Sequence, residues 1–391
     1  MSVQVREQGS VCGPRGIWGT HRSTHRSLWV AVSVLAACAV PAMGGADPVP
    51  SPTSGSTIAA GARLYICNQG EATVSILDAS TRELIETVDL QTLGFTVNAK
   101  PHHVAVEPDG SFWYLSLIGE GLVLKFDASN EIVARAEFEV PGMLALHPTE
   151  DILLVGRSMS AVNPPQRIGL IRRSDMEVDE IDVFFPRPHA IAVAPDGARI
   201  YTASLASNQI GSLSLETERL EITPLEGPTH TIVQFAVSPD GRTMVGTAQL
   251  TGRLFVFDLT DPDHPQIRAE VPVEAQPWHP VFTPDGRWVY FANKTANRIT
   301  IVDMRSNQVS KVLEGPGISA PHGSAVSPDG RWVFISSNGA PMSMEAGAPP
   351  MEGGAPRGSV VVIDTETQTI VEVIETGANT TGIAVGGGTG E

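Results

Sequence analysis

Short apolar runs separated by turn-forming residues recur along most of the chain, and they fall into repeating groups of four. In one group a short run precedes Pro284, and Trp288-Val289-Tyr290-Phe291 follows the turn. A third run, Ile299-Thr300-Ile301-Val302-Asp303, ends in an acid, and a weaker fourth run spans 308–312. Runs of this length between turns predict β-strands, so each group predicts a four-stranded antiparallel unit.

The tripeptide Pro-Asp-Gly marks the first turn of each unit and recurs every 40 to 47 residues. Five copies begin at Pro108, Pro195, Pro239, Pro284 and Pro328, and a degenerate copy begins at Pro148. Proline presets φ for a turn, and glycine supplies the positive φ with which the chain re-enters a strand. Four strands in about 44 residues are typical of a propeller blade.

The two ends of the repeating region complement each other. The region opens at Arg63 with a strand of the second type, and it ends with a strand of the first type at Gly382-Ile383-Ala384-Val385. We therefore predict an all-β, seven-bladed propeller over residues 63–386, closed by the C-terminal strand joining the N-terminal blade. Residues 387–391 form a tail.

The blades resemble the YVTN-repeat propellers, in which an aromatic-containing strand and Asn precede a Val/Ile strand ending in Asp. The matching residues are Leu64-Tyr65-Ile66-Cys67-Asn68 with Thr73-Val74-Ser75-Ile76-Leu77-Asp78, and Val289-Tyr290-Phe291-Ala292-Asn293 with Ile299-Thr300-Ile301-Val302-Asp303. The Trp-Asp and Gly-His signatures of WD40 repeats are absent. The resemblance implies a WD40-like fold but not a function, because the family includes surface-layer and binding proteins, and related propellers house metal and redox sites.

Composition and charge narrow the classes of partner. The formal net charge is −17, and residues 1–46 are basic, so the rest of the chain stands near −20. Such an acidic surface repels phosphate backbones, which argues against nucleic acid as a partner. We also find no nucleotide-binding loop, no Gly-x-Ser-x-Gly nucleophile motif and no Cys-x-x-Cys-His haem attachment site.

The N-terminal 46 residues predict export. An apolar stretch of 13 residues, 28–40, follows Arg22 and Arg26 and is too short to span a bilayer comfortably. Residues 35–38 (Leu-Ala-Ala-Cys) resemble a lipobox, which would acylate Cys38 and give a lipid-anchored lipoprotein. Ordinary signal-peptide cleavage near Ala42 or Ala46 is the alternative. Residues 47–62 predict a flexible linker, and both routes place the protein in the periplasm or cell envelope.

Several residues that could suggest chemistry have a simpler structural interpretation. The acids that end the third strands, such as Asp78 and Asp258, each precede a turn that an Asx cap explains. Cys67 lies within a predicted strand, and we expect it to be buried as a small apolar residue.

Histidines gather where the first strands begin. His102, His189 and His322 each follow a proline and stand six residues before the proline of the next turn. His103 and His279 occupy the next position along, and His230 lies slightly upstream. Because first strands line the central channel, these six side chains should surround one opening, where imidazoles could bind zinc or copper. The alternative is that they belong to the repeat and cap neighbouring carbonyls.

Two further features lie at the same mouth. Trp278, beside His279, could stack a ligand or plug the channel. A long loop in the last blade carries Met342, Met344 and Met351, whose thioethers suit Cu(I), or whose presence is incidental in a Pro/Gly-rich insert.

The leading hypothesis from these patterns is a non-catalytic, exported propeller that binds a metal ion or small ligand at the His-lined mouth. One alternative is an enzyme, either a propeller hydrolase or lactonase or a copper oxidase using the same mouth. Another is a scaffold that binds an envelope protein. In each case contact with the membrane would come only through a lipid anchor on Cys38.

Overall fold

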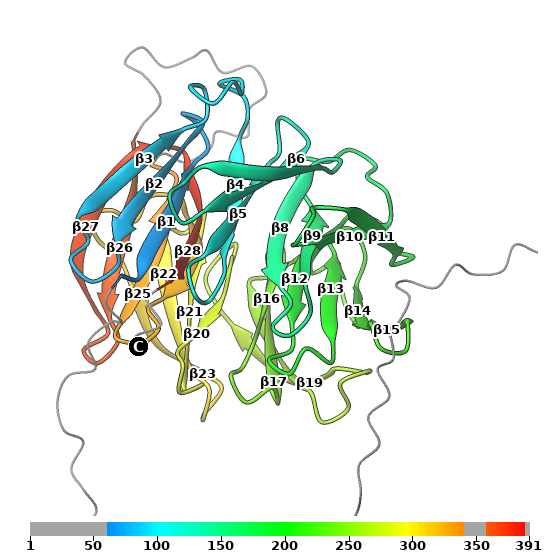
Figure 1. Ribbon diagram of the computed structural model, residues 1–391. Coiled ribbons are helices and arrows are strands. Elements are labelled where there is room, and N and C mark those ends of the chain that lie inside the picture. Colours follow the sequence, from blue (N-terminus) through cyan, green and yellow to red (C-terminus); the bar gives the residue numbers. More distant parts are fainter. Residues whose placement is uncertain (1–60, 340–356, 388–391) are drawn as a thin grey trace, which may run out of the picture. The chain divides into compact units, whose positions relative to one another are not determined.

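The computed structural model describes residues 61–339 and 357–387, and these residues form seven four-stranded antiparallel sheets (Figure 1). The first three sheets contain β1 (Arg63–Asn68), β2 (Thr73–Asp78) and β3 (Leu84–Asp89); β4 (Pro101–Val106), β5 (Phe112–Leu117), β6 (Leu122–Asp127) and β7 (Ile132–Glu137); β8 (Pro141–Leu146), β9 (Ile152–Arg157), β10 (Arg167–Arg172) and β11 (Val178–Asp182). The next two contain β12 (Pro188–Val193), β13 (Ile200–Ser204), β14 (Gln209–Ser214) and β15 (Arg219–Pro224); β16 (Ile232–Val237), β17 (Thr243–Ala248), β18 (Arg253–Asp258) and β19 (Gln266–Pro272). The last two contain β20 (Val281–Phe282), β21 (Trp288–Asn293), β22 (Arg298–Asp303) and β23 (Gln308–Leu313); β24 (Pro321–Val326), β25 (Trp332–Ser337), β26 (Arg357–Asp364) and β27 (Thr369–Ala378), with β28 (Thr380–Gly386) completing the first sheet.

The predicted seven-bladed propeller is confirmed. In six sheets the strands follow chain order, each paired with its sequence neighbour, and inner strands of adjacent sheets contact one another. The seventh sheet has the order β28-β1-β2-β3, so the last strand of the described chain is its innermost one. Arg63 pairs with Gly386 and Leu64 with Val385, as expected for ring closure by the C-terminal strand. Figure 1 shows β1 and β28 side by side.

The turn chemistry explains why the chain folds back where it does. The glycines of the five Pro-Asp-Gly copies all have positive φ, between 67° and 75°. The predicted Asx caps are present, since Asp78 Oδ1 accepts from the backbone N–H groups of Ser80 and Thr81. In the regular copies the glycine N–H donates to a backbone carbonyl, as Gly110 N does to Glu107 O, whereas in the degenerate copy Glu150 N donates to the ring nitrogen His147 Nδ1 at 2.9 Å.

Burial follows the position of a strand within its blade. The second and third strands are buried almost throughout, as in β5 and β6, whereas outer strands such as β3 and β27 alternate or lie exposed. Apolar side chains of neighbouring sheets pack face to face, and Trp113 stacks on Phe126 in this layer with ring centroids 3.9 Å apart. Cys67 is fully buried, which raises the pKa of its thiol and makes it unreactive.

Some sequence-based predictions fall on residues that the structure does not describe. These are the export segment 1–46, the linker up to residue 60, Met342, Met344, Met351 and the tail from residue 388. Within the described ranges, no helix is long and apolar enough to cross a membrane.

Candidate functional site: a histidine cluster at one mouth of the channel

Each inner strand is entered through the same backbone conformation. One residue with positive φ stands before it in all seven blades: Lys100, Val140, Arg187, Thr231, Gln276, Ala320 and Asn379. The loop between second and third strands bonds to this entry, as when Ser158 N donates to Val140 O and Lys294 N to Gln276 O. These two sets of loops therefore share one face, and the residue two positions after each left-handed residue lies at the mouth of the channel.

A bulge in the inner strand determines where consecutive side chains point. In β4, Pro101 pairs with Leu117 and Val104 with Leu115, so His102 and His103 together oppose Ser116. The same shift occurs at the start of β8, β12, β16, β24 and β28. In a regular strand successive side chains would point to opposite faces, whereas a bulge re-aims them. Both His102 and His103 consequently contact other histidines of the mouth.

Glycines let the inner strands approach closely at this mouth. A Cβ atom at Gly382 would lie 2.2 Å from the carbonyl oxygen of His102 in the next blade. At Gly323 it would lie 2.7 Å from the carbonyl oxygen of Thr381. Buried Ser116 joins the bulge of its own blade to the next one, because it accepts from His103 N and donates to Gly142 O. The mouth is thus narrow, and side chains from blades on opposite sides of the ring can meet.

Four imidazoles form a connected cluster across the channel. The ring centroids of His279 and His322 are 4.9 Å apart, those of His102 and His322 are 5.8 Å apart, and those of His103 and His279 are 6.1 Å apart. Trp278 packs on the same group, with its ring centroid 4.4 Å from that of His322. The prediction that these histidines gather around one opening therefore holds for these four residues. We call these four histidines with His189 the histidine cluster.

Burial keeps the imidazoles of the histidine cluster neutral. Desolvation lowers the pKa of His103 and of His189 to about 4, and lowers the pKa values of His102, His279 and His322 well below the ordinary 6.5. Neighbouring imidazoles and Lys294 lower these pKa values further. No carboxylate among the described residues raises the pKa of His102, His279 or His322.

The hydrogen bond of His189 fixes its tautomer. Its Nδ1 lies 2.7 Å from the carbonyl oxygen of Arg157, which can only accept, so Nδ1 carries the proton. Because the ring is neutral, Nε2 has a free lone pair, and Nε2 is buried with no hydrogen-bond partner among the described residues. This arrangement, with Nδ1–H on a backbone carbonyl and Nε2 free, is the one that metal-binding histidines use.

His279 and His322 also have nitrogens without partners. His279 Nε2 and His322 Nδ1 are buried and accept no hydrogen bond from the described residues, although the two side chains are only 5% and 2% exposed. By contrast, His103 Nδ1 accepts from Leu144 N at 3.3 Å, and His102 Nδ1 lies 3.4 Å from Gln69 Nε2. Burying a polar atom without a partner costs about 1–3 kcal/mol, so a bound ligand that contacts these nitrogens would stabilise the folded protein.

His230 lies outside the cluster. Its Nε2 bonds to Glu226 O at 2.8 Å, its Nδ1 bonds to Thr251 Oγ1 at 3.1 Å, and its ring packs edge-on against Phe255. Both nitrogens are used by the preceding connection and by a loop of its own blade, which is the capping role that the sequence left open as the alternative.

Lys294 is the residue of the site that sequence reasoning missed. Its Nζ lies 4.2 Å from the ring centroid of Trp278, and burial lowers its pKa to about 8. It follows Asn293 in the loop between second and third strands of its blade, on the histidine face. Lys294 N donates to Gln276 O, so the loop that carries Lys294 is bonded to the segment that leads to Trp278 and His279. The position of this loop between second and third strands is the signal that could have placed Lys294 at the mouth.

The side chains of the histidine cluster do not form a complete metal site in their present positions. In residues 61–339 and 357–387, no group of three or more His, Cys, Asp or Glu side chains is arranged as it stands to hold a metal ion. The 4.9 Å between the ring centroids of His279 and His322 nevertheless matches two imidazoles on one tetrahedral ion, whose centroids lie about 5 Å apart when the metal–nitrogen bonds are about 2.0–2.1 Å. The other imidazoles would have to rotate to complete a site.

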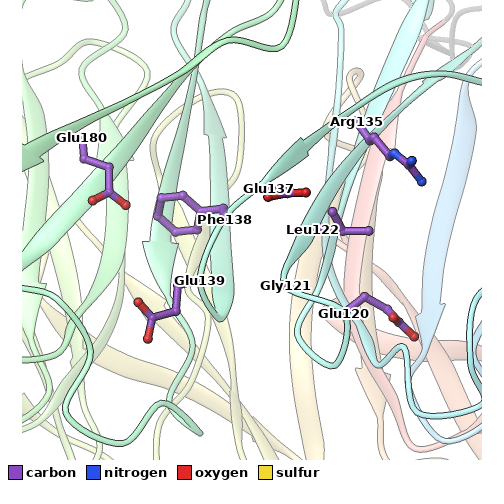
Figure 2. A pocket seen from close by; sticks show the side chains of 8 residues that line it. All are labelled: Glu120, Gly121, Leu122, Arg135, Glu137, Phe138, Glu139 and Glu180. Atoms are coloured by element: carbon purple, nitrogen blue, oxygen red, sulfur yellow. The ribbon is translucent and has the colours of Figure 1, made fainter.

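A hollow whose lining contains no histidine lies between two blades. Figure 2 shows it at the edge of two neighbouring blades, where Glu120, Glu137, Glu139 and Glu180 surround Phe138. Two of its carboxylates have local partners: Glu120 accepts from Thr96, and Glu180 pairs with the buried Arg157. This hollow of about 550 Å³ is an acidic groove without an orphaned buried atom among its lining residues.

Comparisons with known proteins support the fold alone. No family model and no curated protein matches the chain. A functionally unknown protein from Desulfotomaculum acetoxidans is 14% identical, with a TM-score of 0.66, covering 83% of this chain and 99% of that one. A putative 6-phosphogluconolactonase from Bacteroides fragilis is 13% identical, with a TM-score of 0.62, covering 85% and 99%. The dihydro-heme d1 dehydrogenase NirN is 16% identical, with a TM-score of 0.57, covering 82% and 74%.

Proposed function

We propose that this chain is an exported binding propeller that holds a transition-metal ion, zinc or copper, in the histidine cluster. The observation that carries the proposal is the set of three buried imidazole nitrogens without partners, His189 Nε2, His279 Nε2 and His322 Nδ1. They belong to one group of neutral rings drawn from three blades. Neutral imidazole is the form that binds metals.

The chemistry of the donor set favours zinc or copper over harder cations. The cluster offers imidazole nitrogens, whereas magnesium and calcium prefer carboxylate and carbonyl oxygens. No carboxylate among the described residues perturbs the pKa values of these histidines. Met342, Met344 and Met351 remain candidate thioether ligands for Cu(I), on the grounds of sequence alone.

A binding role fits this site better than hydrolysis. A lactonase would need a general base or a divalent ion held with carboxylate, Asn or Arg side chains around the substrate. Among the described residues, the cluster combines neutral histidines, Trp278 and Lys294 without such an acid. The likeness to a putative lactonase supports only the shared fold. Placement in the periplasm or cell envelope, with or without a lipid anchor, rests on residues 1–46.

Metal titration of purified protein tests the proposal. Zn²⁺ and Cu²⁺ should each be measured by calorimetry, and we expect one ion per chain in the parent. His322→Asn and His279→Asn should each weaken binding at least tenfold, because each removes an orphaned ring nitrogen. His264→Asn is the matched control, since this imidazole is half exposed and pairs with Asp261.

Two outcomes would reject the metal proposal. One is less than a tenth of an ion per parent chain after reconstitution. The other is a His322→Asn protein that keeps the parent's melting temperature and also keeps its metal affinity. Retained melting matters, because a variant that merely unfolds would lose binding for a different reason.

A further inference from the structure

Two hydrogen-bond donors beside the histidine cluster have no acceptor among the described residues. Trp278 Nε1–H is buried without a partner, and the ammonium group of Lys294 forms no ion pair or hydrogen bond with the described chain. Two other part-buried lysines behave differently: Lys125 Nζ donates to Arg173 O and Lys311 Nζ to Gln368 O. The face of the Trp278 ring is the contact that the structure gives this ammonium, and a partly desolvated ammonium without an acceptor or a negative partner is costly.

Neither donor can serve a metal ion. An indole N–H has no lone pair to offer, and a protonated amine repels a cation. The groups acting on the neighbouring rings His102, His279 and His322 are other imidazoles and Lys294, all neutral or positive. Lys294 is thus the charged group among these causes, and it is positive in a chain whose formal net charge is −17. Among the described residues, Trp278 Nε1–H and the Lys294 ammonium therefore lack a negatively charged hydrogen-bond acceptor.

We propose that Lys294 and Trp278 form the binding site for a small oxyanion, such as a carboxylate or phosphate, beside the histidine cluster. Lys294 supplies the charge and Trp278 Nε1–H a directional hydrogen bond. The site lies beside the proposed metal centre, uses none of its ligands and does not depend on the metal, because both donors are present in the chain alone. With a metal bound, the anion would offset the positive charge of the ion and of Lys294.

The test uses the full chain, stripped of metal with a chelator that is then removed, in chloride-free buffer at pH 7. Acetate and inorganic phosphate are titrated separately by calorimetry, so that the two sources of oxyanion are distinguished. We expect one site for at least one of them. Lys294→Met, which keeps an unbranched apolar stem against Trp278, should weaken binding at least tenfold, and Lys294→Arg should restore most of it.

Two further variants sharpen the result. Trp278→Phe keeps an aromatic ring but removes the N–H, so it should weaken binding severalfold. Lys100→Met is the matched control: it removes one exposed positive charge from the same face, at the entry to β4, and should leave affinity unchanged. Equal affinity of parent and Lys294→Met, or equal losses in Lys294→Met and Lys100→Met, would overturn the proposal.

The two proposals fail separately. Oxyanion binding that depends on Lys294, in a protein that takes up no zinc or copper, would keep this inference and reject the metal centre. Zinc binding without any saturable acetate or phosphate binding, in either the stripped or the loaded protein, would do the reverse.

Discussion

One backbone hydrogen bond at His189 decides which ring nitrogen is free. Because Arg157 O accepts from Nδ1–H, the lone pair on Nε2 is available, and the low pKa of about 4 keeps it so in mild acid. The pKa of Lys294, by contrast, is about 8, so its charge changes in mild base. Metal binding should therefore respond to pH in an unusual range.

At the residue scale we predict that zinc affinity stays nearly constant from pH 7 to pH 5. Ordinary histidines, with pKa values near 6.5, would lose up to about tenfold per pH unit per ligand over that range, whereas burial holds the pKa of His189 at about 4 and those of His279 and His322 well below 6.5. Affinity should rise above pH 8, because Lys294 then loses its positive charge. Calorimetry at pH 5, 6, 7 and 8.5 measures this. A steep fall between pH 7 and pH 6 would contradict the depressed pKa values.

At the element scale we predict that the bulge in β4 is what allows both His102 and His103 to point into the channel mouth. Deleting His103 would leave His102 alone opposite Ser116 and restore a regular ladder from Pro101 to Val104. β4 should still pair with β5, but the side chain of His102 should point away from His322 and lose its contact with that ring. Metal affinity of the deletion protein should fall well below that of His103→Ala, which keeps the bulge. Equal affinities in the two proteins, both folded by circular dichroism, would show that the bulge has no such role.

The strands could be predicted from the sequence, whereas the bulges could not. Short apolar runs predict the strands, Pro-Asp-Gly turns or a degenerate copy mark six of the seven blades, and the positive φ of the glycines follows from the turn type. One extra residue in a ladder leaves no periodic signal, so the shared orientation of His102 and His103 was not predictable. The close approach at Gly382 and the position of Lys294 depend on contacts between blades, which a single sequence does not display.

At the scale of the whole molecule the ring depends on its last strand. A chain ending at Gly386 should melt like the parent. A chain ending at Thr380 loses most of β28, and with it the partners of Arg63, Leu64, Tyr65 and Ile66. Because β28 also contacts β4 and β24, its loss exposes apolar faces of two neighbouring blades. Loss of cooperative unfolding or aggregation is expected in thermal scans, and identical melting of both truncations would show that the ring closes elsewhere.

Ring closure has a mechanical consequence. β1 enters the propeller at Arg63 and β28 leaves it at Gly386, and these two residues are paired at the same end of one antiparallel ladder. Tension on the two ends of the propeller would therefore open this ladder like a zipper, one pair at a time, instead of shearing all its hydrogen bonds together. The blade that completes the circle is thus the one most easily parted by force, and the histidine mouth lies at the far end of that ladder, where Asn68 meets Thr380.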